Sequence, residues 1–354
     1  MEPLKQLTEP LLSWYGANAR DLPWRRSPDA YRVWVSEIML QQTRVAAVLG
    51  YYARFLEAFP TVEALAAADE GQLMKLWEGL GYYSRARNLQ KAARVITEQL
   101  GGRFPETYEG LMALPGIGDY TAGAILSIAF GQRVPAVDGN VLRLAARITG
   151  SRADVTDMKV RRAFRAQVLE AMPEAKRSGA YNQALMDLGA TVCLPNGEPL
   201  CESCPARDFC VGHLTGCARE LPVRAPKRKR RVEERTVLVL LSPDGAALRR
   251  RPDTGLLAGL WEFPNVEGKL DEAAAAALAE QWGLEIKNWC RRITARHIFT
   301  HVEWHMTGYV LRVRGRGPED FVWAREEELA SSLAVPSAFA RFLAEAREEL
   351  QGQQ

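Results

Sequence analysis

Apolar residues recur at the spacing of amphipathic helices through the first part of the chain. Glycine and proline residues separate these segments, for example at Pro60 and Gly150. We therefore predict that residues 1–217 are mainly α-helical. The clearest helical segments are Val33–Leu49, Leu73–Leu80, Thr121–Phe130, Val141–Ile148 and Ala180–Val192.

The pattern changes after Cys217. Residues 222–231 include six basic residues and two prolines, so they cannot form a core. We predict a basic linker at 218–232, which is either a solvated spacer or a strap that contacts DNA phosphates. Residues 233–354 are predicted to form an α+β domain. Its expected strands are Thr236–Leu241, Ala246–Arg249, His297–Val302 and Met306–Arg312, and its expected helix is Asp271–Trp282.

Length and composition narrow the class of protein. The chain has 354 residues, which is enough for two domains. Its composition, with 47% hydrophobic and 25% charged residues, excludes a disordered chain. Its longest uncharged run, Tyr120 to Gln132, is 13 residues, too short to cross a bilayer. The N-terminus shows no apolar signal or transit segment. We therefore expect a cytoplasmic protein, and the net charge of +3 does not by itself identify a partner.

Four of the six cysteines lie close together in the sequence, at Cys193, Cys201, Cys204 and Cys210. Four thiolates can close a tetrahedral zinc site or hold an iron–sulfur cluster. Zinc ribbons pair two Cys-x2-Cys knuckles, whereas this loop has one such pair flanked by single cysteines. We predict an iron–sulfur cluster with a structural role in loop 193–210, with zinc as the first alternative and unliganded structural thiols as the second. Cys217 and Cys290 lie outside the pattern.

A glycine-rich turn lies between two helical segments, at residues 114–118. Gly116 and Gly118 allow a tight turn and a close approach of another backbone. The amides at the start of the following helix can bind a phosphate oxygen. A Gly-x-Gly alone is usually only a turn, but the full string Leu114-Pro115-Gly116-Ile117-Gly118 is typical of the hairpin in helix–hairpin–helix DNA-binding proteins.

Two carboxylates are expected in contrasting surroundings. Helical spacing places Glu37 among Val33, Trp34 and Leu40, where burial raises the pKa of a carboxyl group. Asp138 directly precedes a helix, whose first amides stabilise an ionised carboxylate. The plainer alternatives are a Glu37 that reaches solvent and an Asp138 that only caps its helix. One neutral acid with one carboxylate is what cleavage of a glycosidic C–N bond needs.

Together these features resemble the helix–hairpin–helix DNA glycosylases of the endonuclease III superfamily, and among them the adenine DNA glycosylases of MutY type. The resemblance covers nearly the whole chain. The strings that carry it are Pro23–Arg25, Val35–Thr43, Gly79–Tyr83, Leu114–Gly118, Val137–Val141 and the cysteine loop.

The resemblance implies roles for individual residues. Glu37 would protonate the adenine ring, Asp138 would stabilise the sugar cation, and Asn140 would position water or a carboxylate. Core packing is the plainer alternative for Trp24 and Tyr82. The implied pocket for a flipped adenine is Leu22, Trp24, Arg25 and Gln183, and the implied DNA contacts are Gln42, Tyr82, Leu114, Gly116 and Gly118. The four loop cysteines would hold one [4Fe–4S] cluster, although seven residues separate Cys193 from Cys201 where the family commonly has six.

Position 120 bears on the reaction type. Bifunctional lyases of this superfamily carry a lysine there, which attacks the sugar as a Schiff-base nucleophile. This chain has Tyr120, and a phenol cannot form an imine. The sequence therefore predicts a monofunctional hydrolase.

The second domain resembles the Nudix fold through Gly259–Pro264, but its Nudix box is broken. Ala276-Ala277 and Glu280-Gln281 replace the carboxylate-bearing pairs that bind magnesium. The resemblance implies a reader of 8-oxoguanine, formed by Phe299, Thr300 and His301, with Thr300 in place of a serine. A polar turn without a ligand is the alternative.

These expectations combine into one function: base excision repair of adenine mispaired with 8-oxoguanine or guanine, by base flipping. The expected partner is double-stranded DNA, with no membrane, and the expected state is a monomer associated with the nucleoid. Two alternatives remain: a thymine or uracil glycosylase of the same superfamily, and a non-catalytic DNA-binding iron–sulfur protein.

Overall fold

The computed structural model describes residues 3–226 and 229–352, and the chain forms two compact units. Residues 1–67 and 88–226 form what we call the helical unit, and residues 68–87 and 227–354 form the sheet unit. Lys227 and Arg228 of the predicted basic linker lie outside the described residues. The domain boundaries at 217 and 233 stay a prediction.

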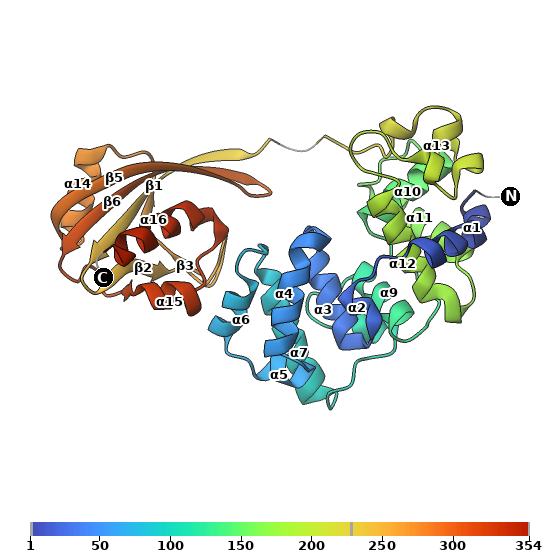
Figure 1. The fold of residues 1–354 in the computed structure, drawn as a ribbon, viewed down its shortest axis with the longest axis horizontal. Coiled ribbons are helices and arrows are strands. Elements are labelled where there is room, and N and C mark those ends of the chain that lie inside the picture. The colour runs from blue at the N-terminus through green and yellow to red at the C-terminus, as the bar shows by residue number, and fades with distance from the viewer. Residues whose placement is uncertain (1–2, 227–228, 353–354) are drawn as a thin grey trace. The chain divides into compact units, whose positions relative to one another are not determined.

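The helical unit confirms the mainly α fold class predicted for the first part of the chain (Figure 1). Its helices are α1 (Pro3–Asn18), α2 (Pro23–Arg26), α3 (Ala30–Leu40), α4 (Val45–Ala58), α5 (Val62–Ala67), most of α7 (Ser84–Gln99), α8 (Tyr108–Met112), α9 (Asp119–Ile128), α10 (Gly139–Thr149), α11 (Met158–Ala171), α12 (Ala175–Thr191) and α13 (Val211–Leu214). Short 3-10 turns occur at η1 (Cys201–Ser203), η2 (Arg207–Phe209) and η3 (Ala218–Glu220).

The segment predicted as one helix over Val33–Leu49 is two helices. The chain leaves α3 after Leu40 and enters α4 at Val45, and between them Gln42 adopts a positive φ of 58°. The break carries the polar segment 41–44, about one helical turn long, with apolar residues on both sides, so periodicity alone does not distinguish it from the exposed turn of a longer helix.

One hydrophobic core of the helical unit joins α1, α10, α11 and α12. Leu4, Leu7 and Leu11 contribute the buried face of α1, at the three- and four-residue spacing of a helix. The same core includes Cys193 and Cys210. The helix α10 therefore runs within a core that also carries the cysteine loop.

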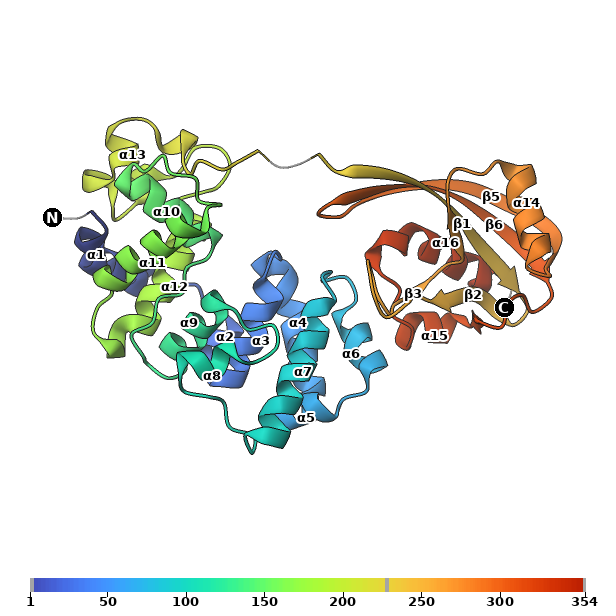
Figure 2. The same ribbon diagram turned by 180° about the vertical axis from the view of Figure 1, so that it is seen from behind.

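The sheet unit contains a seven-stranded mixed sheet with helices, so its predicted α+β class is confirmed (Figure 2). The strand order is β3-β2-β1-β6-β5, with β4 paired to β1 and β7 paired to β2. Among the strands of the described residues, only the β1–β6 pair is parallel. The elements are α6 (Glu70–Trp77), β1 (Arg231–Ser242), β2 (Gly245–Arg250), β3 (Trp261–Glu262), β4 (Asn265–Glu267), α14 (Glu272–Gln281), β5 (Glu285–Ile298), β6 (Val302–Arg314), β7 (Phe321–Ala324), α15 (Glu326–Ser331), η4 (Ser337–Phe339) and α16 (Ala340–Gln351).

Alternating side chains of β1 serve two cores. Val237 and Val239 pack with Phe342 of α16, whereas Leu238 belongs to a second cluster with Ala275 of α14. The sheet is therefore covered by helices on both faces, which explains why β1 reads as a continuous apolar run.

One predicted strand is wrong. Residues His297–Val302 are not a strand but the end of β5, a turn at 299–301 and the start of β6. The chain reverses at this turn, which carries the polar residues Thr300 and His301. Among the described residues, no helix has the length and apolar character needed to span a membrane.

Candidate active site

One cavity of about 440 Å³ in the helical unit gathers the residues to which catalysis and adenine binding were assigned. Helices α2, α3, α9, α10 and α12 contribute to its wall. The predicted residues that line it are Leu22, Trp24, Arg25, Glu37, Gln42, Tyr120, Asp138, Asn140 and Gln183. Residues from positions 22 to 183 of the chain therefore meet at one site, and its volume suits a small planar ligand.

Glu37 lies on the buried face of α3, as predicted, and only 5% of its surface is exposed. Its Oε2 accepts a hydrogen bond of 2.5 Å from the Tyr120 hydroxyl. Burial raises the pKa of Glu37 to about 7; the Tyr120 bond and the charge of Arg25 lower it, and the charge of Asp138 raises it. A carboxyl group with such a pKa can donate a proton near neutral pH.

Asp138 caps the N-terminus of α10, and its carboxylate accepts three hydrogen bonds. Its Oδ1 accepts from the backbone N–H groups of Asn140 (2.9 Å) and Val141 (2.8 Å), and its Oδ2 accepts from Nδ2 of Asn140 (2.8 Å). Burial raises the pKa of Asp138 despite these donors, a direction that the helix-start argument did not anticipate. Asp138 is thus a helix cap and a cavity residue at once.

Asn182 fixes the loop that leads to Asp138, and sequence reasoning missed it. This fully buried residue of α12 accepts a hydrogen bond from the Ala136 N–H (3.1 Å) and donates to Val134 O (2.9 Å) and to Oγ of Ser127 (2.8 Å). An asparagine that satisfies so many buried partners holds the loop in one conformation. Nothing in its local sequence signals this role.

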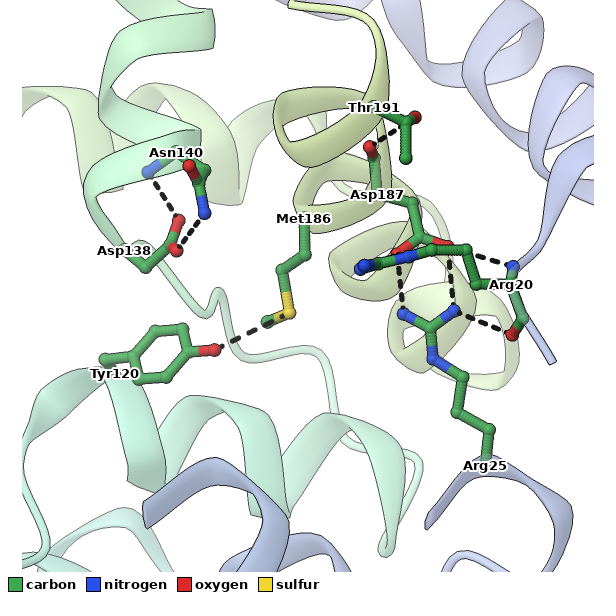
Figure 3. A network of polar contacts seen from close by, with 8 residues as sticks. All are labelled: Arg20, Arg25, Tyr120, Asp138, Asn140, Met186, Asp187 and Thr191. Atoms are coloured by element: carbon green, nitrogen blue, oxygen red, sulfur yellow. Dashed lines mark hydrogen bonds and ion pairs between the residues drawn. The ribbon is translucent and has the colours of Figure 1, made fainter. Parts of the chain in front are cut away.

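Tyr120 extends from α9 toward Glu37 and Met186. Burial raises the pKa of its phenol well above the ordinary value, so the hydroxyl stays a neutral donor. The hydroxyl also lies 3.6 Å from the sulfur of Met186 on α12 (Figure 3). Tyr120 therefore orients Glu37 by a hydrogen bond.

A buried ion network lies beside the cavity, and sequence reasoning identified only one of its members, Arg25. Asp187 of α12 accepts hydrogen bonds from the guanidinium groups of both Arg20 and Arg25 (Figure 3). The cavity is lined by both arginines. Asp187 follows Gln183 by one helical turn, which is a weak signal for a shared site.

Two of the implied DNA contacts, Gln42 and Tyr82, share an unusual backbone conformation. Gln42 has a φ of 58° in the helical unit, and Tyr82 has a φ of 48° in the sheet unit, where it is 46% exposed. Leu257 is the other non-glycine residue with positive φ in the described part of the chain. Such strained positions cost energy and concentrate at functional sites.

The predicted hairpin lies between α8 and α9. Gly116 has a φ of 77°, and a Cβ there would lie 2.7 Å from the Cβ of Asn88. Gly118 caps α9, and a Cβ added to it would meet no atom within 4 Å, so another backbone can approach it. Leu114 is buried and anchors the turn instead of facing outward.

The four loop cysteines line one small cavity together with Arg147. A guanidinium nitrogen of Arg147 lies 3.2 Å from the sulfur of Cys193. No three metal-binding side chains of the described residues converge closely enough to hold a single ion. Cys217 does not line this cavity and instead lies 3.2 Å from Oγ1 of Thr215.

The turn at 299–301 is anchored and exposed at the same time. Phe299 packs edge-on against His297 and Trp304, with ring centroids 4.5 and 4.9 Å apart. Thr300 and His301 are exposed, and Oγ1 of Thr300 lies 3.3 Å from the Tyr82 hydroxyl. Phe299 therefore fixes the turn while the next two residues face outward.

Comparisons with known proteins agree with this arrangement. Residues 35–168 match the family described as HhH-GPD superfamily base excision DNA repair protein, and residues 236–345 match the NUDIX domain. The chain is 37% identical to the human adenine DNA glycosylase over 94% of this chain and 72% of the human protein. It is 32% identical to the adenine DNA glycosylase of Buchnera aphidicola subsp. Acyrthosiphon pisum (strain APS), over 86% and 85% of the two chains. A solved thermostable thymine-DNA glycosylase superposes with a TM-score of 0.55 at 27% identity, over 60% of this chain and 97% of that one.

Proposed function

Because the chain belongs to the adenine DNA glycosylases of base excision repair, we propose that it hydrolyses the N-glycosidic bond of adenine opposite 8-oxoguanine or guanine. The substrate is double-stranded DNA, and the enzyme acts as a monomer in the cytoplasm, at the nucleoid. The single observation that carries the mechanism is the pairing of Glu37 with Asp138 in one cavity.

Glu37 is the general acid of this proposal. Adenine leaves a sugar slowly as an anion, and protonation of a ring nitrogen makes it a neutral leaving group. The Tyr120 bond holds the Glu37 carboxyl toward the cavity. The adenine must leave the base stack to reach this acid, and Gln42 and Tyr82 are proposed to fill the gap in the stack.

Asp138 stabilises the sugar cation that forms as the base departs. Its carboxylate is held rigidly by the three donors of Asn140 and Val141, so it cannot turn away from the developing charge. A water molecule then attacks C1′ of the sugar, and Asn140 is placed to position it or the carboxylate. Leu22, Trp24, Arg25 and Gln183 enclose the adenine.

The same cavity supports a monofunctional reaction. Of the described residues that line it, none is a lysine, and Tyr120 stands at the position where the resemblance implies a lysine in bifunctional lyases. Without an amine, no Schiff base forms and the product is an abasic site.

The loop of Cys193, Cys201, Cys204 and Cys210 is proposed to hold one [4Fe–4S] cluster. The donor set fits because four thiols and a guanidinium surround one cavity, and Arg147 can donate to a thiolate. A cluster held by these four cysteines would act as a structural clasp between the loop and α10, whose core Cys193 and Cys210 share.

The sheet unit is proposed to read 8-oxoguanine through the turn at 299–301. This lesion carries an N7–H donor where guanine has an acceptor, and the exposed Thr300 hydroxyl can accept from it. The proximity of Tyr82 to Thr300 supports a common DNA-facing surface in this unit.

The test of the proposed mechanism is single-turnover excision by a Glu37→Gln variant. We expect a loss of about 10²–10⁴-fold in rate, the usual contribution of a general acid, with binding of mismatched DNA retained. Glu63→Gln, on α5 and outside the cavity, is the matched control and should keep the unaltered rate. Full activity of Glu37→Gln would refute the acid assignment.

A further inference from the structure

Asp187 is a buried carboxylate shared by two guanidinium groups. Oδ1 accepts from Nε (2.8 Å) and Nη2 (2.5 Å) of Arg20 and from Nη2 of Arg25 (2.8 Å), while Oδ2 accepts from Nη1 of Arg25 (2.7 Å) and from the backbone N–H of Arg20 (3.3 Å). The Asp187 side chain is 1% exposed, against 27% for Arg20 and 13% for Arg25. Figure 3 shows both arginines converging on this one carboxylate.

We propose that Asp187 is a positioning residue for adenine excision, which clamps the guanidinium of Arg25 at the cavity wall and holds its charge off Glu37. The proposal rests on the proposed role of Glu37 as the acid. Asp187 does not itself line the cavity, whereas Arg25 does. It therefore acts through the arginine and not by contact with adenine.

The geometry of the clamp supports this assignment. Arg25 contributes two nitrogens to two different oxygens of Asp187, an arrangement that fixes both the place and the plane of the guanidinium. Its Nη1 also donates to the carbonyl of Arg20 (3.3 Å), and its guanidinium lies 5.7 Å from the ring centre of Tyr15. A side chain held at so many points stays at the cavity wall and cannot turn further toward Glu37.

A purely structural account explains the clamp less well. Burying a carboxylate between two arginines incurs a large desolvation cost, and apolar residues of similar volume commonly hold helices together at least as well. A charged clamp beside an ionisable catalytic group has a consequence that an apolar contact lacks, because it sets the electrostatic field at that group.

Charged and titratable groups reach Glu37 from three elements. Tyr120 comes from α9, Asp138 from the start of α10, and Arg25 from α2. Arg25 is the positive member of this set, and its charge lowers the pKa of Glu37; Arg20, the other partner of Asp187, also lines the cavity. Without Asp187, the positive charge of Arg25 is no longer compensated. Its guanidinium can then move toward Glu37 and Asp138, the acidic groups that line the cavity.

The test is the pH dependence of single-turnover adenine excision by the full chain carrying Asp187→Asn. An acid must be protonated to act, so activity falls as pH rises through its pKa. We expect the falling limb of the profile to move about one unit toward lower pH, the usual size of an effect from one nearby opposite charge. Asp187→Glu, which keeps the carboxylate, should restore the limb to within about half of that shift.

The chain supplies a matched control in its other unit. Glu262 is also a buried carboxylate between two arginines, with Arg249 at 3.0 Å and Arg251 at 2.5 Å, and its side chain is 4% exposed. Glu262→Gln should lower the melting temperature as Asp187→Asn does, yet leave the falling limb in place. A limb that moves equally in both variants would reduce Asp187 to a general stabilising residue.

A second variant covers the case in which Asp187→Asn does not fold. Arg25→Lys keeps the positive charge and the Arg20–Asp187 pair, but an ammonium group cannot span two carboxylate oxygens in the same way. We expect its falling limb to move in the same direction. An unmoved limb in either folded variant overturns the clamp. If Glu37→Gln proves fully active, the acid assignment fails instead, which separates the two outcomes.

Discussion

Glu37 and Asp138 are the same kind of group in surroundings that differ in hydrogen-bond donors. Glu37 accepts one hydrogen bond from the hydroxyl of Tyr120, whereas Asp138 accepts hydrogen bonds from three N–H groups. Burial raises the pKa of both carboxyl groups, to about 7 at Glu37, while the donors at Asp138 oppose that rise. This contrast agrees with the proposed roles, in which Glu37 donates a proton and Asp138 stabilises a positive charge.

The raised pKa of Glu37 predicts how stability depends on pH. The folded protein holds this proton up to about pH 7, whereas the unfolded chain releases it near the ordinary value of 4.5. The stability that this proton contributes is therefore full below pH 4.5 and is lost as pH rises through about 7, at roughly 1.4 kcal/mol per unit of pKa difference. Glutamine cannot ionise, so Glu37→Gln should be the more stable protein above pH 7.

Urea unfolding at pH 5 and pH 8 measures this effect. We expect the stability difference between Glu37→Gln and the unaltered protein to grow in favour of the variant by on the order of 2–3 kcal/mol between the two pH values. Glu63→Gln, a change at an exposed position of α5, should show no such pH dependence. A difference that stays constant would mean that Glu37 is ionised in the folded protein at both pH values.

At the scale of elements, the hairpin separates two roles of glycine. Gly116 needs its positive φ and the space beside Asn88, whereas Gly118 has an ordinary φ of −107° and open space at its Cβ position. Gly116→Ala should therefore lose about 1–3 kcal/mol of stability through backbone strain. Gly118→Ala should stay folded but bind duplex DNA more weakly, because a methyl group obstructs the phosphate.

Thermal unfolding and fluorescence anisotropy with labelled duplex DNA test this pair. Gly16→Ala near the end of α1, where a Cβ also meets open space, is the control for both measurements. Unchanged DNA affinity of Gly118→Ala would exclude the hairpin from the DNA contact.

The cysteine loop predicts a coloured, iron-containing protein. The purified chain should be brown, with broad absorption in the blue and about four irons per molecule. Cys201→Ser should lose this absorption, whereas Cys217→Ser, outside the cavity, should keep it. A colourless protein with one zinc ion and full activity would contradict the cluster.

Sequence reasoning succeeded where the signal is local and failed where it depends on distant partners. Glu37 and Asp138 stand out because burial and helix capping follow from a few neighbouring residues. Asp187 and Arg20 are 167 positions apart, and no local pattern announces their contact. The break between α3 and α4 was missed because apolar residues lie on both sides of the short polar segment 41–44.

At the scale of the whole molecule, chemistry and lesion reading are proposed to lie in different units. The turn at 299–301 supports this division because Phe299 is anchored on Trp304 while Thr300 is exposed. A single hydrogen bond contributes about 0.5–1.5 kcal/mol, so Thr300→Ala should reduce the preference for 8-oxoguanine over guanine by roughly two- to tenfold. Thr300→Ser, which keeps the hydroxyl, should retain the preference.

The rates of single-turnover adenine excision opposite 8-oxoguanine and opposite guanine give that preference as their ratio. Ser331→Ala, a change at an exposed residue of α15, controls for general effects on the sheet unit. An unaltered ratio in a variant with alanine at 299, 300 and 301 would show that the lesion is read elsewhere.

Strand cleavage is the decisive measurement for the proposed function. The duplexes carry adenine opposite 8-oxoguanine, adenine opposite guanine, thymine opposite guanine or uracil opposite guanine. We predict breaks at the adenine strands alone, fastest opposite 8-oxoguanine, and only after alkali opens the abasic site that a monofunctional enzyme leaves. Breaks at thymine or uracil, equal breaks without alkali, or binding without any break would each contradict the account.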